Sequence, residues 1–217
     1  MPIPGTFLHD TFESTIILFI VLHPFASIPF FQGLTAGATE LQRRAIAKKS
    51  AIVVFIILIV FADLGDAILT VLHITLNYLM IAGGIFIIVF AVHDVTTGEY
   101  EAKAKSSTRS VGLPKTVADR IAVVPIAIPL LAGPGAIATV MVLNDFEYAS
   151  SFNFSTAVAV LINSLATWLL LSLSSRLTRV INPSVFIVVG KVMDILIGAI
   201  GVSYLVRGAG GIFGLNI

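Results

Sequence analysis

Apolar residues occur along the chain in six long runs separated by shorter polar segments. Each run holds about 20 residues, the length that an α-helix needs to cross the hydrocarbon core of a bilayer. The runs are continuous, whereas strands of a membrane β-barrel alternate apolar and polar positions. The pattern therefore predicts an all-α membrane protein with six transmembrane helices. The expected spans are about 15–34, 50–71, 78–95, 121–143, 155–173 and 185–206.

Proline and glycine interrupt two of these runs. The first run contains His23-Pro24 and then Pro29, and the fourth contains Pro125, Pro129 and Gly133-Pro134-Gly135. A proline inside a helix removes a backbone donor and clashes with the carbonyl four residues earlier. Backbone groups freed in this way need partners in hydrocarbon, so such breaks occur inside protein or beside a wet cavity. We expect helices 1 and 4 to be broken near the membrane midplane, as in many transporters.

The longest hydrophilic segment separates two halves of similar length. We interpret residues 98–120 as a cytoplasmic linker between a first three-helix repeat, 1–97, and a second, 121–217. Pro24-x-Ala26 matches Pro134-x-Ala136 at an offset of 110 residues, and Gly84 and Gly190 lie at a similar offset. With three spans in each half, the second repeat is inverted relative to the first.

Composition and charge agree with a membrane protein and predict its orientation. The chain is 57% hydrophobic and 12% charged, with a mean hydropathy of +1.03. The loops after expected spans one, three and five hold 4, 5 and 2 Lys and Arg residues, and those after spans two and four hold none. The positive-inside rule then places both termini outside the cytoplasmic membrane. The absence of cysteine excludes disulfides and Cys-based metal sites.

The two breaks together predict a binding site for a small anion. Half-helices that begin at Pro24 and Pro134 present free amides and positive dipole ends near the midplane, where a substrate carboxylate fits. The small residues around them indicate a narrow pocket, which favours glycine or alanine as substrate. The alternative is that both clusters are packing kinks. The expected substrate-binding residues are Pro24, Ala26, Ser27, Gly133, Pro134, Gly135, Ala136 and Ile137.

Three further polar residues inside the spans are candidates for ion coupling or for the cavity wall. His23 either couples substrate to protons or caps carbonyls at the break. Asp194 either pairs with Lys191 one turn away or binds a proton. Asn163 either links helices or lines the cavity. The expected coupling ion is a proton or sodium.

Enzyme, metal and cofactor motifs are missing from the sequence. It has no His-Glu-x-x-His, no Gly-x-Ser-x-Gly and no P-loop, and its four histidines lack metal-ligand spacing. We therefore expect no catalysis, no cofactor, no metal and no nucleic-acid partner. Gly83-Gly84 and Gly198-x-x-Gly201 permit close helix packing, within one chain or in an oligomer.

The segment 125–137, P-I-A-I-P-L-L-A-G-P-G-A-I, resembles the signature of the MarC family of membrane proteins. Residues 61–66 and 81–85 resemble the second and third spans of that family. The resemblance implies six spans in two inverted halves, a fold akin to the LysE exporters, and amino acid transport as in an archaeal branch of the family. The family usually reads Asp-Pro-x-Gly-Asn where this chain has His23-Pro24-Phe25-Ala26-Ser27, so a role of that aspartate does not carry over.

The sequence thus predicts a secondary transporter of small neutral amino acids that works by alternating access. Two alternatives stay open. One is an exporter of drugs or other small metabolites, which the origin of the family name in an antibiotic-resistance locus suggests. The other is a channel-like or purely structural membrane protein.

Overall fold

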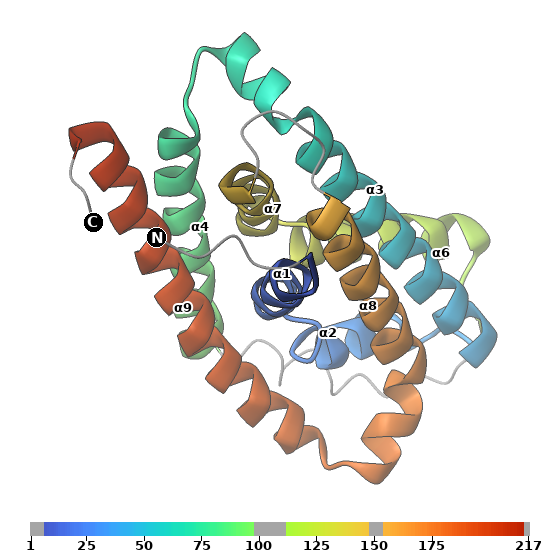
Figure 1. The fold of residues 1–217 in the computed structure, drawn as a ribbon. Helices are drawn as coiled ribbons and strands as arrows, with labels where there is room; N and C mark the ends of the chain where they lie inside the picture. Colours follow the sequence, from blue (N-terminus) through green and yellow to red (C-terminus); the bar gives the residue numbers. More distant parts are fainter. Residues whose placement is uncertain (1–6, 98–111, 148–153, 215–217) are drawn as a thin grey trace.

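The computed structural model describes residues 7–97, 112–147 and 154–214, and all regular structure within them is helical (Figure 1). The first half contains α1, α2, α3 and α4, and the second half contains α6, the π-type segment η1, α7, α8 and α9. Their bounds are α1 Phe7–Leu22, α2 Ser27–Leu34, α3 Glu40–Leu72, α4 Leu76–Thr97, α6 Lys115–Ile121, η1 Ala122–Leu131, α7 Pro134–Glu147, α8 Phe154–Val180 and α9 Pro183–Phe213.

The described helices confirm the all-helical membrane class. Four of them, α3, α4, α8 and α9, are each long and apolar enough to cross a bilayer. Helices α1 and α2 meet at a 48° bend and together make one broken span, which gives four to five candidate spans in the described residues. The fourth expected span is divided between η1 and α7. Each of these two pieces is too short to cross a bilayer alone.

The helices extend beyond the apolar runs that predicted them. Helix α3 begins at Glu40, ten residues before the expected span, and α9 continues to Phe213, seven residues beyond the end of the sixth expected span. A capping box starts α3: the Thr39 side chain accepts from the Gln42 amide at 3.3 Å, and the Gln42 side chain accepts from the Thr39 amide at 3.1 Å. Hydropathy marks only the part of a helix that lies in lipid, so the predicted ends were wrong.

The two broken segments lie in the centre of the molecule. Figure 1 shows α1, α2 and α7 between the pair α4 and α9 on one side and the pair α3 and α8 on the other. Leu18 and Leu22 of α1, Phe31 of α2, and Ile126 and Leu131 of η1 are almost fully buried in one core cluster. The apolar faces of the outer helices are exposed, as lipid contact requires.

Helices α4 and α9 contact each other backbone to backbone. A Cβ on Gly84 would lie 2.6 Å from the Gly201 carbonyl oxygen, and a Cβ on Gly201 would lie 2.9 Å from the Gly84 oxygen. This reciprocal contact requires glycine on both sides. The close packing expected for these two glycines therefore occurs within one chain.

Hydrogen bonds from buried and partly buried polar side chains connect the central segments to the outer helices. Ser50 of α3 donates its hydroxyl to the Ala122 carbonyl at 2.8 Å. Arg43 donates from Nε to the Thr35 carbonyl at 3.1 Å and from Nη1 to the Ser175 hydroxyl of α8 at 3.1 Å. These bonds hold η1 and the end of α2 against the long helices α3 and α8.

An ion pair between Lys49 of α3 and Asp119 of α6, with an N–O distance of 2.9 Å, provides a test of the arrangement at this end of the bundle. The hydrogen bond from Lys49 holds the pKa of Asp119 below its ordinary value of 3.8. Because the pKa of this carboxyl is lower in the folded state than in the unfolded state, the pair stabilises the fold fully above pH 3.8. This stabilisation is lost as the pH falls through the lower pKa of the folded state. We expect Lys49→Gln to raise the Asp119 pKa in an NMR titration, whereas Lys48→Gln, at an exposed neighbour, leaves it unchanged.

Candidate functional site

The break between α1 and α2 is centred on His23. This residue has a φ of +53°, a left-handed conformation that ends α1, and it precedes Pro24, which disfavours continued helix. The Ser27 amide donates to the His23 carbonyl at 3.2 Å and the Ser27 hydroxyl donates to it at 3.0 Å. The chain therefore turns between His23 and Ser27, and the His23 carbonyl at the break is already hydrogen-bonded.

The second break lies within η1 and just after it. Val124 and Ile128 have extended backbone angles, φ −129° and −128°, and each precedes a proline. The proline ring disfavours helix for the residue before it, which explains both departures. Helix α7 then begins at Pro134, a favoured first position. The predicted interruption of the fourth run is confirmed.

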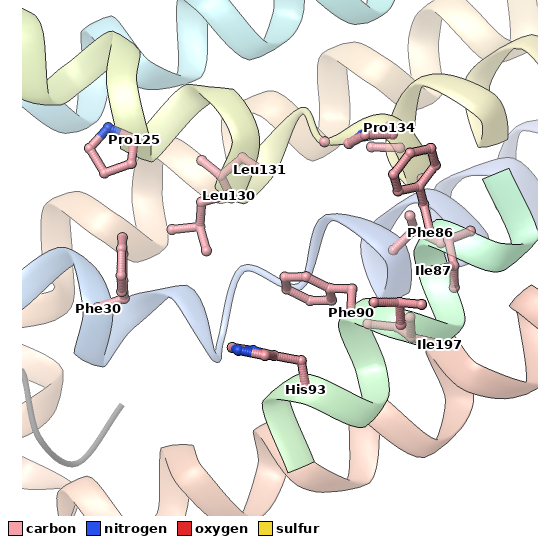
Figure 2. Close-up of a pocket in the computed structure, with 15 residues that line it drawn as sticks. Phe30, Phe86, Ile87, Phe90, His93, Pro125, Leu130, Leu131, Pro134 and Ile197 are labelled. Atoms are coloured by element: carbon pink, nitrogen blue, oxygen red, sulfur yellow. The ribbon is translucent and has the colours of Figure 1, made fainter. Parts of the chain in front are cut away.

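A pocket of about 390 Å³ opens between the two breaks (Figure 2). It lies among α1, α2, α4, η1, α7 and α9. Figure 2 shows Phe86, Phe90 and His93 of α4 on one side of it, and Leu130, Leu131 and Pro134 on the other. Its lining residues are Val21, Phe30, Phe86, Ile87, Val89, Phe90, His93, Pro125, Leu130, Leu131, Gly133, Pro134, Gly135, Ala136 and Ile197.

The expected binding residues divide between the two breaks. The four residues from Gly133 to Ala136 line the pocket. Pro24, Ala26, Ser27 and Ile137 are not among its lining residues. Ala26 and Ser27 are 2% and 1% exposed, so the start of α2 is covered by protein. The start of the second half-helix therefore lines the pocket, whereas α2 reaches it only through Phe30.

The amides at these two helix starts differ in what they can bind. The amides of Ser27 and Ile137 donate to the carbonyls of His23 and Gly133, so these two amides are not free to bind a ligand. The first amides of a helix have no acceptor within the helix. At α7 these amides include those of Gly135 and Ala136, which line the pocket and lie at the positive end of the helix dipole.

A buried cluster of ionisable side chains lies beside the pocket. The His23 ring forms a hydrogen-bonding contact through Nε2 with the Gly190 carbonyl of α9 at 3.2 Å, and its Nδ1 lies 3.4 Å from Oδ1 of Asp194. Asp94 of α4 completes the group, and one ligand atom from each of the three residues lies within 4.8 Å of the others. Phe90, which lines the pocket, meets the His23 ring edge-on with centroids 6.5 Å apart.

The cluster places Asp194 beside His23 and includes Asp94, which is not among the candidate residues expected from the sequence. Asp194 faces His23, whereas the side chain of its expected partner Lys191 is exposed. Asp94 is 9% exposed and lies near the end of the third expected span. An ionisable residue inside an apolar run is a sufficient signal to find it.

Asn163 holds two helices together. Its Nδ2 donates to the Thr15 carbonyl of α1 at 3.1 Å and to the Ala159 carbonyl of its own helix, α8, at 2.9 Å. The side chain is 1% exposed, and Asn163 is not among the residues that line the pocket. Of the two roles considered from the sequence, these contacts support the interhelical one.

Comparison with known proteins identifies relatives along almost the whole chain. A family model described as "MarC family integral membrane protein" matches residues 8–213. The chain is 32% identical to the UPF0056 membrane protein YhcE of Escherichia coli, with 93% of each chain covered. It is 34% identical to a UPF0056 membrane protein of Methanocaldococcus jannaschii, covering 89% of this chain and 93% of that one. It is 31% identical to YvbG of Bacillus subtilis, covering 91% and 93%. No solved structure matches the chain.

Proposed function

We propose that this chain, which belongs to the MarC family of integral membrane proteins, is a secondary transporter of small neutral amino acids. Glycine and alanine are the leading substrates. The chain would act in the cytoplasmic membrane with both termini outside, by rocking of two inverted halves around the pocket between the breaks.

The observation that carries this proposal is the start of α7 at the pocket. The pocket between the broken helices is lined at one place by the start of α7, residues Gly133, Pro134, Gly135 and Ala136. Most of its other lining residues are apolar. A helix start binds an anion through its free amides and its dipole, and both are stronger away from bulk water. A substrate carboxylate is the anion that suits this point. The absence of a side chain at Gly133 leaves its backbone accessible to the carboxylate, and the absence of one at Gly135 lets Ile87 of α4 pack against the start of α7.

The opposite side of the pocket suits the ammonium group of the same substrate. The aromatic rings of Phe86 and Phe90 line it, and a cation over an aromatic face gains about 0.5–2 kcal/mol. The apolar remainder of the lining suits a short aliphatic side chain and excludes charged ones. A zwitterion of small size therefore has a partner for each of its charges.

The packing of the helices supports the division into six segments and two inverted halves. The broken segment α1 packs on α8 of the other half, and the broken segment η1–α7 packs on α3 of the first half. The third elements of the two halves, α4 and α9, pack on each other. This exchange of equivalent partners is what a pseudo-two-fold relation between halves produces.

A second candidate is supported by the nature of the lining. Besides the α7 start, the pocket is lined mainly by Phe, Leu, Ile and Val, and its volume of about 390 Å³ exceeds what glycine fills. These features favour an exporter of apolar small molecules. The two functions differ in whether an amino acid carboxylate is required.

Uptake of labelled glycine into proteoliposomes tests the proposal. We expect uptake that saturates, shows counterflow, and falls when alanine but not glycinamide competes, because glycinamide lacks the carboxylate. An imposed proton gradient should accelerate uptake if His23 and Asp194 couple transport to protons, and a sodium gradient should do so if sodium is the coupling ion. Linear flux without counterflow would indicate a channel, and binding of hydrophobic cations without glycine uptake would favour the exporter.

A further inference from the structure

The hydrogen-bond roles of the His23 ring are fixed by its surroundings. The Gly190 carbonyl can only accept, so Nε2 carries the hydrogen in the 3.2 Å contact between them. In the neutral ring, Nδ1 then presents a lone pair to Oδ1 of Asp194, 3.4 Å away. Within the described residues, His23 Nδ1 and both carboxylate oxygens of Asp194 are buried without a hydrogen-bond donor or acceptor. A proton on one of the two atoms, or a metal cation between them, makes this arrangement favourable.

The charge of the cluster also favours a bound cation. His23, Asp94 and Asp194 are 3%, 9% and 1% exposed, and together they bring two carboxylates into a site shielded from water. Burial of like charges is costly unless a counter-charge is close. The side chain of Lys191, one turn from Asp194, is exposed. A dication bound between the carboxylates supplies such a counter-charge.

We propose that His23, Asp94 and Asp194 form a binding site for a divalent transition-metal ion of the Zn²⁺, Mn²⁺ or Co²⁺ class. One imidazole nitrogen with two carboxylate oxygens is a ligand set for these ions, whereas Na⁺ and Mg²⁺ prefer oxygen alone. Metal–ligand bonds of about 2.1 Å place neighbouring tetrahedral ligands about 3.4 Å apart. The three ligand atoms lie within 4.8 Å of one another, so they must draw closer together when a metal binds.

The contact with Gly190 is part of this site. A metal-binding histidine usually donates its second ring nitrogen to a carbonyl or carboxylate, which fixes the tautomer and orients the ring. Gly190 provides that carbonyl from α9, the helix that also carries Asp194. The spacing of histidines along the sequence gave no sign of this site because its ligands come from three elements that meet only in the fold.

The site goes beyond the proposed transport function and competes with proton coupling. Nδ1 of His23 and the carboxylate oxygens are the same atoms that a coupling proton would use. Metal binding to them displaces protons, so the ion and the proton exclude each other. Bound metal would therefore fix α1, α4 and α9 together at the break and hold the transporter in one conformation.

Metal binding by the purified full-length chain in detergent tests the site without any transport assay. After treatment with a chelator, we expect the chain to take up one Zn²⁺ or Mn²⁺ per molecule, measured by elemental analysis and by calorimetry. The variants His23→Asn and Asp194→Asn should each bind at least about 100-fold more weakly. His73→Asn is the matched control: His73 also has a positive φ, +55°, but it ends α3 outside the cluster and should not affect binding.

Spectroscopy of the wild-type chain keeps the test decisive if a variant does not fold. Pulsed electron paramagnetic resonance of the Mn²⁺-loaded chain should show coupling to one imidazole nitrogen, and Co²⁺ should give visible bands of nitrogen–oxygen coordination. Less than about 0.2 ion per chain with all three metals, or full binding by His23→Asn, would overturn the proposal. Either result would leave the transport proposal standing, because that proposal is tested separately by glycine uptake.

Discussion

Replacing Gly135 with valine is expected to lower glycine uptake at least about tenfold, equivalent to about 1.4 kcal/mol. Gly135 is in the first turn of α7 and lines the pocket. A Cβ at this position would lie 2.5 Å from Cγ1 of Ile87, another lining residue. The larger side chain therefore covers the amides offered to the carboxylate and pushes α4 away. The measurement is the initial rate of labelled glycine uptake in proteoliposomes of matched protein content.

Two further variants separate blockage of the pocket from damage to the fold. Ile87→Ala in the Gly135→Val background removes the clashing atom, so it should restore stability without restoring uptake. Gly198→Ala introduces a methyl group only 3.9 Å from Ala91 Cβ, an ordinary contact, and should transport normally. Wild-type uptake by Gly135→Val would show that the start of α7 is not the binding point.

The second large effect concerns stability: Gly84→Ala should destabilise the chain by about 1–3 kcal/mol, the usual cost of overpacking a well-packed interior. The added Cβ would meet the Gly201 carbonyl oxygen at 2.6 Å, and a backbone atom cannot rotate away as a side chain can. Helices α4 and α9 must separate along their contact. Thermal unfolding in detergent, followed by circular dichroism, measures the loss.

Gly198→Ala again provides the comparison, since it places alanine in the same helix pair without a close contact. Its stability should equal or slightly exceed that of the wild type, because alanine reduces the freedom of the unfolded chain. Equal stability of Gly84→Ala and the wild type would mean that α4 and α9 do not approach each other as closely as the structure shows.

Proline made the two breaks predictable from the sequence. Its effects reach only one residue back and four residues back, so Val124, Ile128 and His23 depart from helix wherever the fold places them. The membrane class was predictable for a similar reason, because each apolar run is recognised on its own. Helix ends were not: Thr39 and Gln42 start α3 in a polar segment where hydropathy gives no signal.

The site was predictable only in part, because it depends on how separate elements pack. Gly133 to Ala136 line the pocket as expected, but the start of α2 is closed by its own hydrogen bonds and by α9, which passes close to Ala26. The cluster required the meeting of His23 with Asp94 and Asp194, which are far from it along the chain. Nothing in the local pattern around His23 indicates which carboxylates will face it.

The length of helix α3 determines how the chain meets the lipid headgroups. Its 33 residues extend about 50 Å, whereas the 22 residues of α4 extend about 33 Å, close to the thickness of the hydrocarbon core. The excess of α3 carries its basic first turns, including Arg44 and Lys48, whose side chains are exposed. Such side chains attract anionic phospholipids by about 1 kcal/mol each. Headgroup charge is therefore expected to influence how deeply the first turns of α3 sit at the membrane surface.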